Sequence, residues 1–392
     1  MSLVNLSDKQ RSTREEELPL LTYAHDASDS AQFIEKESSK SRRNRRKTET
    51  SESNKRNIQQ SWRTSRHPTS ASCQQSSDNQ ESFNCLQCCF YSLVCCAIGC
   101  WLACPPVPSC VANKIAFRPP RRGKTYGLSC EDADGEMIEV DSACQAYGKE
   151  QIRIIPRKNA ELIATALSNS NVFVVKTAKK NHLVCVWLSS NIPSDKNVIL
   201  LMAQPNSCDL GDLVTFRIIS DNMGVDAVLF DYSGYGMSSG RATEANIYAD
   251  IEAVYKFIRQ RNSTAHIVLI GISLGTTACV DLASKNPGNV AGVVLVAPLA
   301  SGCRLLCRKP NKGRSSWLDQ FCSIDKVGLI DSPVLLIHGV NDSVISSSHS
   351  LALMKKIKNP VEPLYVEDAD HNNVLGFPEV FRRLRRFIEK EI

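Results

Sequence analysis

The chain has 392 residues, 17 of them cysteine, and a formal net charge of +6. This length allows one sizeable α/β domain with extra sequence, or two modest domains. Eleven Lys or Arg stand against three Glu between Lys36 and Arg66, a balance of +8 that exceeds the charge of the whole chain. The basic character is therefore regional, which excludes a uniformly basic protein.

Residues 1–80 are polar and rich in Ser, Lys, Arg, Glu and Gln, with almost no periodic apolar positions. Such a segment buries too little apolar surface to offset the entropy lost on ordering, so we predict a disordered basic tail. A basic run of this kind can bind nucleic acid, direct nuclear import, lie against an anionic membrane, or simply stay solvated. The segment that follows it favours the membrane, and we expect no nucleic-acid partner.

Residues 81–112 form a cysteine-rich segment that contains no charged residue after Glu81. Disulfide bonds are not expected there, because the cysteines are too closely spaced to pair with good geometry and no signal peptide precedes them. A zinc site is not expected either, because the cysteines lie among Phe, Tyr, Leu, Val and Trp rather than in polar turns. The apolar surroundings indicate a membrane.

This cysteine-rich segment is about long enough to span a bilayer, but Pro105 and Pro106 interrupt it and basic residues flank both sides, which gives no direction of crossing. Several acyl chains beside a polybasic patch satisfy the two-signal requirement for stable anchoring. We therefore predict an S-acylated membrane anchor, with a spanning helix and a buried structural segment as alternatives. The candidate acylation sites are Cys85, Cys88, Cys89, Cys95 and Cys96.

Residues 113–392 alternate between short apolar runs and helical patterns. Continuous apolar runs indicate strands that helices cover on both faces, as in a parallel sheet. We therefore predict one α/β domain with a mostly parallel, doubly wound sheet. The expected strands are 172–175, 183–188, 198–202, 227–230, 266–270, 291–296, 334–337 and 364–366, and the clearest helices are 245–261 and 378–390.

Ser273 lies in the motif Gly-Ile-Ser-Leu-Gly, directly after the apolar run 266–270 and before a helix rich in small residues. The motif alone is weak evidence, because Gly and Ser recur often. A strand before it and a helix after it are typical of a nucleophile elbow, which lifts a serine hydroxyl clear of the sheet beside a base. The context therefore predicts that Ser273 is a nucleophile.

In a hydrolase with this elbow, an acid and then a histidine follow the serine on loops after later strands. His371 follows the last expected strand and is the candidate base, and Asp342 follows the strand before it and is the candidate acid. His338 is excluded as the base because it comes before every acid on its loop. His349 is excluded because it leads into a helix that is expected to turn it away from the site. Ser273 would attack, His371 would move the proton, and Asp342 would orient the imidazole.

Two backbone N–H groups, those of Leu274 and Asn206, are the expected oxyanion hole. Asn206 lies in the loop after the run 198–202. The glycine-containing segment 231–240 lacks the spacing of a phosphate-binding loop, so we interpret it as a structural turn that frames the site. Nothing in the sequence indicates a metal ion or an organic cofactor.

From Cys85 to the C-terminus, several strings resemble the alpha/beta hydrolase domain-containing protein 17 family. Some of them are more specific than the elbow motif itself. The strings are the cysteine cluster leading to Lys114-Ile-Ala-Phe-Arg-Pro-Pro120, the loop 231–240, Tyr248-Ala-Asp-Ile251, the elbow with Thr276, Asp281-Leu-Ala-Ser284, Ile324-Asp-Lys-Val327 and Val361-Glu-Pro-Leu364.

The resemblance implies an alpha/beta-hydrolase fold and a membrane-bound serine hydrolase that removes palmitate from cysteines of other proteins. It implies anchoring through palmitoylated N-terminal cysteines at the cytoplasmic face of the plasma membrane and of endosomes. The nucleophile, acid and base of the family fall on Ser273, Asp342 and His371. Palmitoylated proteins are then the expected substrates, and membrane lipids the expected partners of the anchor and the basic tail.

Two features depart from the family pattern. Gln204-Pro205 stands where the family typically has His-Gly, and a proline fixes φ and removes an N–H. The basic tail is also longer than the short N-terminus of the family. Two alternatives stay open: a lipid esterase that uses the same triad, and a catalytically weak, membrane-associated interaction protein.

Overall fold

The computed structural model describes residue 96, residues 116–192 and 195–307, residue 315 and residues 319–392. The predicted tail, 1–80, and nearly all of the predicted anchor segment, 81–112, lie outside these residues. Within the described ranges, no helix combines the length and the apolar character needed to cross a bilayer.

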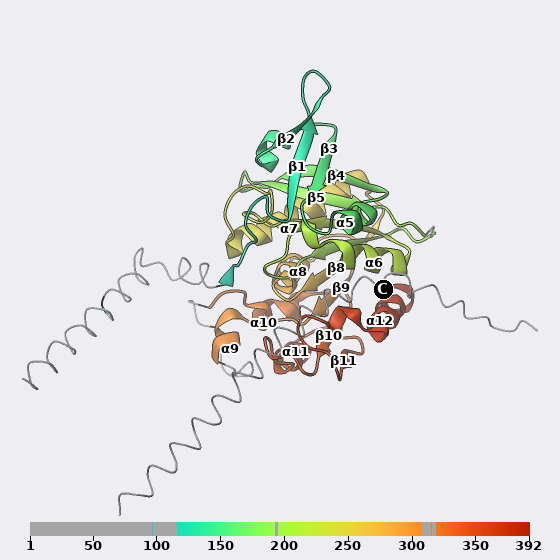
Figure 1. Cartoon of the computed structure of the whole chain (residues 1–392). Coiled ribbons are helices and arrows are strands. Elements are labelled where there is room, and N and C mark those ends of the chain that lie inside the picture. Colours follow the sequence, from blue (N-terminus) through green and yellow to red (C-terminus); the bar gives the residue numbers. More distant parts are fainter. Residues whose placement is uncertain (1–95, 97–115, 193–194, 308–314, 316–318) are drawn as a thin grey trace, which may run out of the picture. The chain divides into compact units, whose positions relative to one another are not determined.

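An eight-stranded sheet forms the centre of the domain, with the strand order β11-β10-β9-β8-β6-β7-β5-β4 (Figure 1). Neighbouring strands are parallel except where β5 pairs with β4 and with β7. The strands are β4 (Ser170–Lys176), β5 (His182–Leu188), β6 (Val198–Ala203), β7 (Asp226–Phe230), β8 (His266–Ile272), β9 (Val290–Val296), β10 (Val334–Gly339) and β11 (Leu364–Val366). The mostly parallel sheet predicted from the continuous apolar runs is confirmed.

Helices cover both faces of this sheet, so that successive strand residues enter two separate hydrophobic cores. Leu201 packs into the core under one set of helices, and Leu200 packs into the core under the other. The first set comprises α7 (Glu244–Arg261), α8 (Gly275–Ala283), α10 (Ser323–Lys326) and α11 (Ser348–Met354), and the second includes α6 (Val214–Met223) and α12 (Pro378–Lys390). Each fully buried aliphatic side chain stabilises the fold by about 1.5–3 kcal/mol, which explains why both faces of the strands are apolar.

The helix α7 shows how local sequence sets these elements. The Thr243 side chain accepts a hydrogen bond from the Asn246 N–H and caps the first turn. Ile247, Ile251 and other apolar residues at spacings of three and four then line the buried face. The structure thus places this helix within one residue of the range predicted from its periodicity.

A small antiparallel sheet with the order β2-β1-β3 precedes the large sheet and was not predicted from the sequence. Its strands are short, and β2 buries only one of its four residues, so no continuous apolar run marks them. Leu128 and Ile154 nevertheless pack into the core that contains α6. The elements are β1 (Tyr126–Glu131), β2 (Met137–Val140), α4 (Ala143–Ala146), β3 (Ile152–Pro156) and α5 (Ala160–Ala166).

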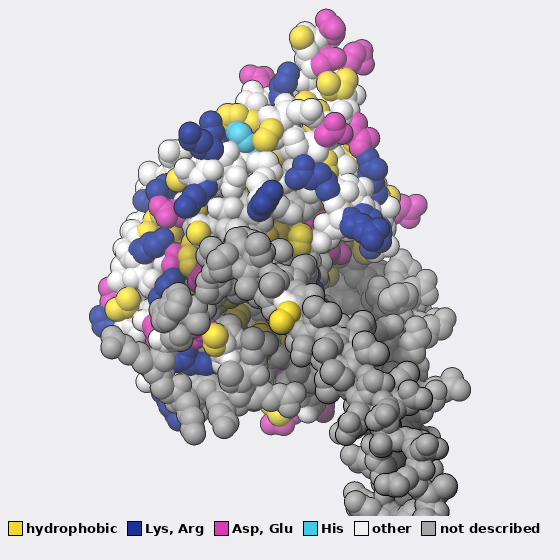
Figure 2. Space-filling model, turned by 90° about the vertical axis from the view of Figure 1, so that its left-hand side faces the viewer, with side chains coloured by type: hydrophobic (Ala, Val, Ile, Leu, Met, Phe, Trp, Pro, Cys, Tyr) yellow, Lys and Arg dark blue, Asp and Glu magenta, His cyan; other side chains and the backbone are white. Residues whose placement is uncertain are grey.

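Acidic side chains gather at the tip of the β1–β2 hairpin, uppermost in Figure 2, whereas Lys and Arg side chains spread over the face below it. The acidic residues of the hairpin are Glu131, Asp132, Asp134, Glu136 and Glu139. The described surface therefore carries both signs of charge, in contrast to the basic segment 36–66.

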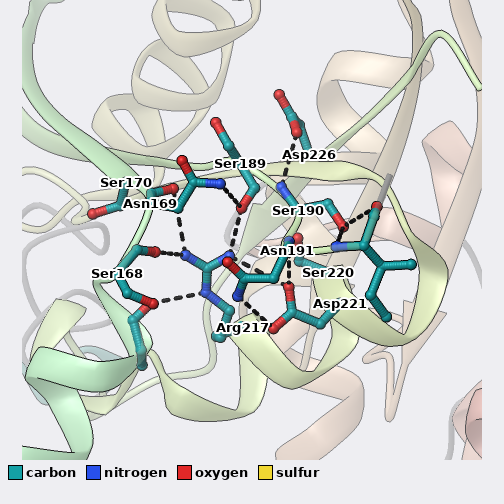
Figure 3. Close-up of polar contacts among 12 residues, drawn as sticks. Ser168, Asn169, Ser170, Ser189, Ser190, Asn191, Arg217, Ser220, Asp221 and Asp226 are labelled. Carbon is teal, nitrogen blue, oxygen red and sulfur yellow. Dashed lines mark hydrogen bonds and ion pairs between the residues drawn. The ribbon is translucent and has the colours of Figure 1, made fainter. Parts of the chain in front are cut away.

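Arg217 on α6 is buried and links three parts of the chain (Figure 3). Its guanidinium donates to the carbonyl oxygens of Ala166, the last residue of α5, of Ser168, just after α5, and of Ser189, after β5. Asp221, one turn further along α6, lies 3.4 Å from the same guanidinium and offsets part of its charge. This arginine therefore satisfies loop carbonyls that burial would otherwise leave without donors.

Short helical segments lie in the connections that follow β6, β9 and β11, the second of which leads into β10. The connection from β9 to β10 includes residues 308–314 and 316–318, which lie outside the described residues. The segments are η1 (Leu210–Asp212), α9 (Gly302–Cys307), η2 (Val327–Leu329) and η3 (Val374–Gly376).

Candidate active site

Ser273 lies at the sharp turn between β8 and α8. Its φ of 51° is in the left-handed region, which is costly for a residue with a side chain, by about 1–3 kcal/mol. The backbone holds this conformation because the Ser273 N–H donates to Val296 O on β9 and the Thr276 hydroxyl donates to Ser273 O. The turn therefore has the backbone geometry expected of a nucleophile elbow.

Both glycines of the motif are required by close backbone contacts. A side chain at position 271 would begin 2.6 Å from Thr276 Cα, and one at position 275 would collide with Ala203 O at the end of β6. Gly275 also lies against Gln204 O, so the elbow touches the loop that carries Asn206. These two positions explain why the strand can turn into a helix within so few residues.

The loops after β10 and β11 are hydrogen-bonded to each other. The Val340 N–H donates to Val366 O, and the Asn341 N–H donates to Ala369 O. Gly339 lies so close to Ala369 that an added Cβ would be 2.5 Å from its carbonyl oxygen. Because the two loops are joined in this way, the carboxyl group on one and the imidazole on the other are brought to the same place.

The structure brings Ser273, His371 and Asp342 together at the carboxyl edge of the sheet. Ser273 Oγ lies 3.0 Å from His371 Nε2, and His371 Nδ1 lies 2.7 Å from Asp342 Oδ2. The Asp342 side chain is fully buried and the His371 side chain is 13 % exposed. With Asp342 ionised, His371 Nδ1–H donates to the carboxylate, which leaves Nε2 free to accept the hydroxyl proton of Ser273.

The carboxylate of Asp342 has several donors. Burial by itself would raise the pKa of Asp342, but hydrogen bonds from His338, His371 and the Ile345 N–H lower it to well below its usual range. The Val344 and Ile345 N–H groups both donate to Oδ1, at 2.9 Å and 2.7 Å. Asp342 therefore stays ionised at neutral pH, as a residue that orients an imidazole must.

His338, which the sequence order excluded as the base, supports the acid instead. It is fully buried, and its Nε2 lies 2.8 Å from Ile345 O and 3.3 Å from Asp342 Oδ2. Because a carbonyl oxygen only accepts, Nε2 carries the proton, and Nδ1 accepts from the Ser350 hydroxyl at 2.6 Å. Sequence reasoning did not assign this role, since nothing local shows that the two side chains face each other.

His349 is buried on α11 and is not part of the triad. Its Nδ1 accepts a hydrogen bond from the Ala300 N–H at 3.0 Å. Burial, together with the charges of His338 and Arg304, lowers the pKa of His349 to about 4. The imidazole is therefore neutral at pH 7 and helps to hold the loop that follows β9.

The two expected oxyanion donors lie on adjoining segments. Leu274 immediately precedes α8, and no hydrogen bond from its N–H to another described residue is found. Asn206 follows β6, which pairs with β8 up to Ala203 and Gly271. The substituted Gln204 is buried, and its Nε2 donates to Phe230 O and to Asp231 Oδ1, both at 2.8 Å.

The segment 231–240 supports the loop that carries Asn206 through two tyrosines. The Tyr232 hydroxyl donates to Gln204 O and the Tyr235 hydroxyl donates to Asn206 Oδ1, each at 2.7 Å. Burial, with the nearby Asp209, raises the pKa of Asp231 to about 8, although several hydrogen bonds favour its charged form. The segment thus frames the site by direct contacts to the loop that carries Asn206.

The other site residues named from the sequence are cysteines. Cys96 is exposed, whereas Cys85, Cys88, Cys89 and Cys95 lie outside the described residues. In the part of the chain that the structure describes, no group of three or more His, Cys, Asp or Glu side chains is arranged to hold a metal ion.

Comparison with known proteins identifies the family. Residues 211–321 match a family profile described as alpha/beta hydrolase fold. The chain is 35 % identical over 296 residues to human alpha/beta hydrolase domain-containing protein 17B, covering 75 % of this chain and 96 % of that protein. It belongs to the alpha/beta hydrolase domain-containing protein 17 family. The match to protein 17C of Xenopus laevis is 36 % identical over 300 residues, covering 75 % of this chain and 94 % of that protein.

Membership of the alpha/beta hydrolase domain-containing protein 17 family makes the chain a hydrolase and confirms the fold predicted from its strands and elbow. Among solved structures, it is similar to the esterase Pf2001 of Pyrococcus furiosus, with 19 % identity, a TM-score of 0.47 and coverage of 58 % of this chain and 95 % of that one. It is also similar to Est1E of Butyrivibrio proteoclasticus with ferulic acid bound, with 16 % identity, a TM-score of 0.47 and coverage of 56 % of this chain and 98 % of that one.

Substitution of Gly275 by alanine tests the elbow of this family member. The new Cβ would collide with Ala203 O, so the turn must shift and move the Ser273 hydroxyl away from His371. We expect the rate of ester hydrolysis to fall by about 100-fold, since displacements near 1 Å cost this much. Gly288→Ala is the matched control, because a Cβ there meets no atom within 4 Å. Equal rates in the two variants would contradict the prediction.

The lowered pKa of His349 predicts a pH dependence of stability. Its pKa is about 4 when folded and near 6.5 when unfolded, so between these values the unfolded chain binds more protons. The free energy of unfolding should therefore fall as the pH falls from 6.5 to 4. His349→Asn keeps an acceptor for the Ala300 N–H but does not titrate. The free energy of unfolding of this variant, measured with urea at each pH, should therefore fall less steeply between pH 6.5 and pH 4. Parallel curves for both proteins would contradict the assignment.

Proposed function

We propose that this chain is a membrane-anchored serine hydrolase that removes palmitate from S-acylated cysteines of other proteins. The observation that carries the proposal is the alignment of Ser273, His371 and Asp342, with hydrogen-bond distances of 3.0 Å and 2.7 Å. A hydrogen-bonded serine, histidine and carboxylate in this order are the parts needed for acyl transfer. The choice of a thioester substrate is supported by the resemblance to the family and is part of the proposal.

In the proposed reaction, Ser273 Oγ attacks the carbonyl carbon of the thioester while His371 Nε2 takes its proton. The negative charge moves to the carbonyl oxygen, where the N–H groups of Leu274 and Asn206 would stabilise it. The intermediate collapses as the carbon–sulfur bond breaks, and His371 returns the proton to the leaving thiolate. The products of this half are a free cysteine and an acylated Ser273.

The second half of the reaction restores the enzyme. His371 takes a proton from a water molecule, whose oxygen attacks the acyl carbon, and then gives that proton to Ser273 Oγ as the ester bond breaks. Palmitate leaves as the free acid. Asp342 stays ionised throughout and stabilises the imidazolium, which agrees with the strong lowering of its pKa. Removal of one oxyanion donor would cost about 2.7–4 kcal/mol of transition-state stabilisation.

We also propose that the cysteine-rich segment is S-acylated and holds the enzyme at the cytoplasmic face of the plasma membrane and of endosomes. An acyl chain contributes about 0.8 kcal/mol for each CH₂ that it buries in the bilayer, and a single chain gives only reversible binding. Several acylated cysteines beside the basic segment 36–66 would give stable anchoring. The palmitoyl groups of substrate proteins lie at the same surface.

A lipid esterase with the same triad is the second candidate, because a serine triad cleaves oxygen esters as well as thioesters. The presence of Pro205 suggested a catalytically weak protein as a third. In the structure, Gln204 Nε2 donates to Phe230 O, and the Tyr232 and Tyr235 hydroxyls donate to Gln204 O and Asn206 Oδ1. Turnover that disappears in His371→Ala would exclude this third possibility.

Turnover of an S-palmitoylated peptide tests the proposed activity. The full-length protein should release free thiol, and Ser273→Ala and His371→Ala should each lower the rate by at least about 1,000-fold. Ser263→Ala and His266→Ala are matched controls, because both residues are exposed and lie near the opposite edge of the sheet. Hydrolysis of a glyceride ester but not of the peptide would favour the lipid esterase, and equal thiol release by Ser273→Ala would refute the mechanism.

Serine replacement of the five candidate cysteines, Cys85, Cys88, Cys89, Cys95 and Cys96, tests the anchor. We expect the membrane-bound fraction to fall by about tenfold, because the remaining basic segment provides only one of the two signals. Hydroxylamine-sensitive labelling should disappear in parallel. Cys144→Ser is the control, since Cys144 is an exposed cysteine of the folded domain. Unchanged membrane binding and labelling of the five-residue variant would contradict the anchor.

A further inference from the structure

Residues 116–118, which we call the strap, lie against residues 204–207, which carry the expected oxyanion donor of Asn206 and which we call the oxyanion loop. The Asn206 side chain donates from Nδ2 to Ala116 O at 2.6 Å, and its Oδ1 accepts from the Arg118 N–H at 3.0 Å. Phe117, between these two contacts, is only 7 % exposed and packs edge-on against Phe321, with 5.6 Å between ring centroids. The strap therefore joins the oxyanion loop to the connection between β9 and β10.

The partners of Asn206 determine how its amide is oriented. A carbonyl oxygen can only accept and a backbone N–H can only donate, so Nδ2 must face Ala116 and Oδ1 must face Arg118. Oδ1 also accepts from the Tyr235 hydroxyl at 2.7 Å and from the Ser207 N–H at 3.1 Å. With these four contacts, the side chain has no freedom to rotate without losing hydrogen bonds.

The same residue carries the backbone N–H expected to bind the oxyanion. A side chain held at one angle fixes the Cα to which that N–H is attached, and Pro205 restricts the preceding φ on the other side. Ser207, the next residue, has a φ of 68°, in the left-handed region, so the loop is not in a relaxed conformation by itself. Something outside the loop must hold it, and the strap makes two of the hydrogen bonds that do so.

We propose that Asn206 is a positioning residue whose side chain uses the strap to aim the oxyanion N–H at the reacting carbonyl. The inference rests on the proposed function, since it concerns the same serine hydrolase site. Only three residues, 113–115, separate the strap from the cysteine-rich segment in the sequence. The chain that leads to the anchor therefore also holds the oxyanion loop, and release of the strap lowers the rate of acyl transfer without unfolding the domain.

A pair of substitutions at Arg118 separates the hydrogen bond from the side chain. Arg118→Pro removes the N–H that donates to Asn206, and the position precedes a proline, so extended backbone is already favoured there. Arg118→Ala keeps the N–H and removes only the exposed side chain. In the full-length protein with p-nitrophenyl butyrate, Arg118→Pro and Asn206→Ala should each lower kcat by about 10- to 100-fold. Arg118→Ala should stay within about twofold of the unmodified protein.

Three further readouts distinguish positioning from loss of structure. KM should change by less than about twofold, because the oxyanion contact forms in the transition state. The inhibition constant of a butyl trifluoromethyl ketone should rise by the same factor by which kcat/KM falls. The double variant Asn206→Ala with Arg118→Pro should be no slower than the slower single variant, because Asn206→Ala already removes the contact that Arg118→Pro removes. Active-site titration corrects all rates for the folded fraction.

Unchanged kcat in Asn206→Ala and Arg118→Pro would overturn the proposal, as would equal losses in Arg118→Pro and Arg118→Ala. Additive losses in the double variant would also overturn it. The assay uses an oxygen ester, so these outcomes do not depend on whether palmitoylated proteins are the substrates. Failure of the proposed function would give a different result. Thiol release from an S-palmitoylated peptide would persist in Ser273→Ala, or the protein would hydrolyse the ester without releasing any thiol.

Discussion

The left-handed backbone of Ser273 is the constraint on which the rest of the site depends. A serine adopts this conformation only if the surrounding backbone compensates for its cost. Here the end of β6 lies directly against the start of α8 at Gly275, and Gly271 leaves room for Thr276. Because both close approaches involve backbone atoms, the hydroxyl is presented by the rigid centre of the sheet rather than by a mobile loop.

Parallel strand order brings the other groups to that hydroxyl. The carboxyl ends of β8, β10 and β11 lie at one edge, so the loops that follow them meet there. Hydrogen bonds between the last two loops then set the distance from Asp342 to His371, and buried His338 supports the acid from the other side. The Asp342 carboxylate thus accepts hydrogen bonds from His338, His371 and the Ile345 N–H. These donors lower the pKa of Asp342 in spite of its burial.

Much of this arrangement could be predicted from the sequence because it depends on local patterns of apolar residues and on the order of residues along the chain. Buried parallel strands are continuous apolar runs, and chain order after the elbow reduces the choice of acid and base to Asp342 and His371. The small sheet β2-β1-β3 could not be found this way, because none of its strands is a continuous apolar run. Ser129 interrupts β1, Arg153 interrupts β3, and β2 buries only one of its four residues. His338 and His349 were excluded from the triad, but their actual contacts depend on how helices and loops pack.

The strap illustrates a second limit of sequence reasoning. Asn206 was expected to contribute a backbone N–H, and nothing in its neighbours indicates that its side chain binds residues 116 and 118, some ninety positions earlier. Gln204-Pro205 was expected to reshape the loop. In the structure, Gln204 Nε2 joins the loop to Phe230 O and Asp231 Oδ1 at the end of β7, and these contacts depend on packing that the local sequence does not show.

Peptide mapping after reaction with a fluorophosphonate tests the central claim most directly, because the reagent bonds to whichever serine is activated by a neighbouring base. The geometry predicts one adduct, on the peptide that contains Ser273, and its formation should slow by orders of magnitude in His371→Ala. An adduct on another serine, or an unchanged rate in that variant, would contradict the account.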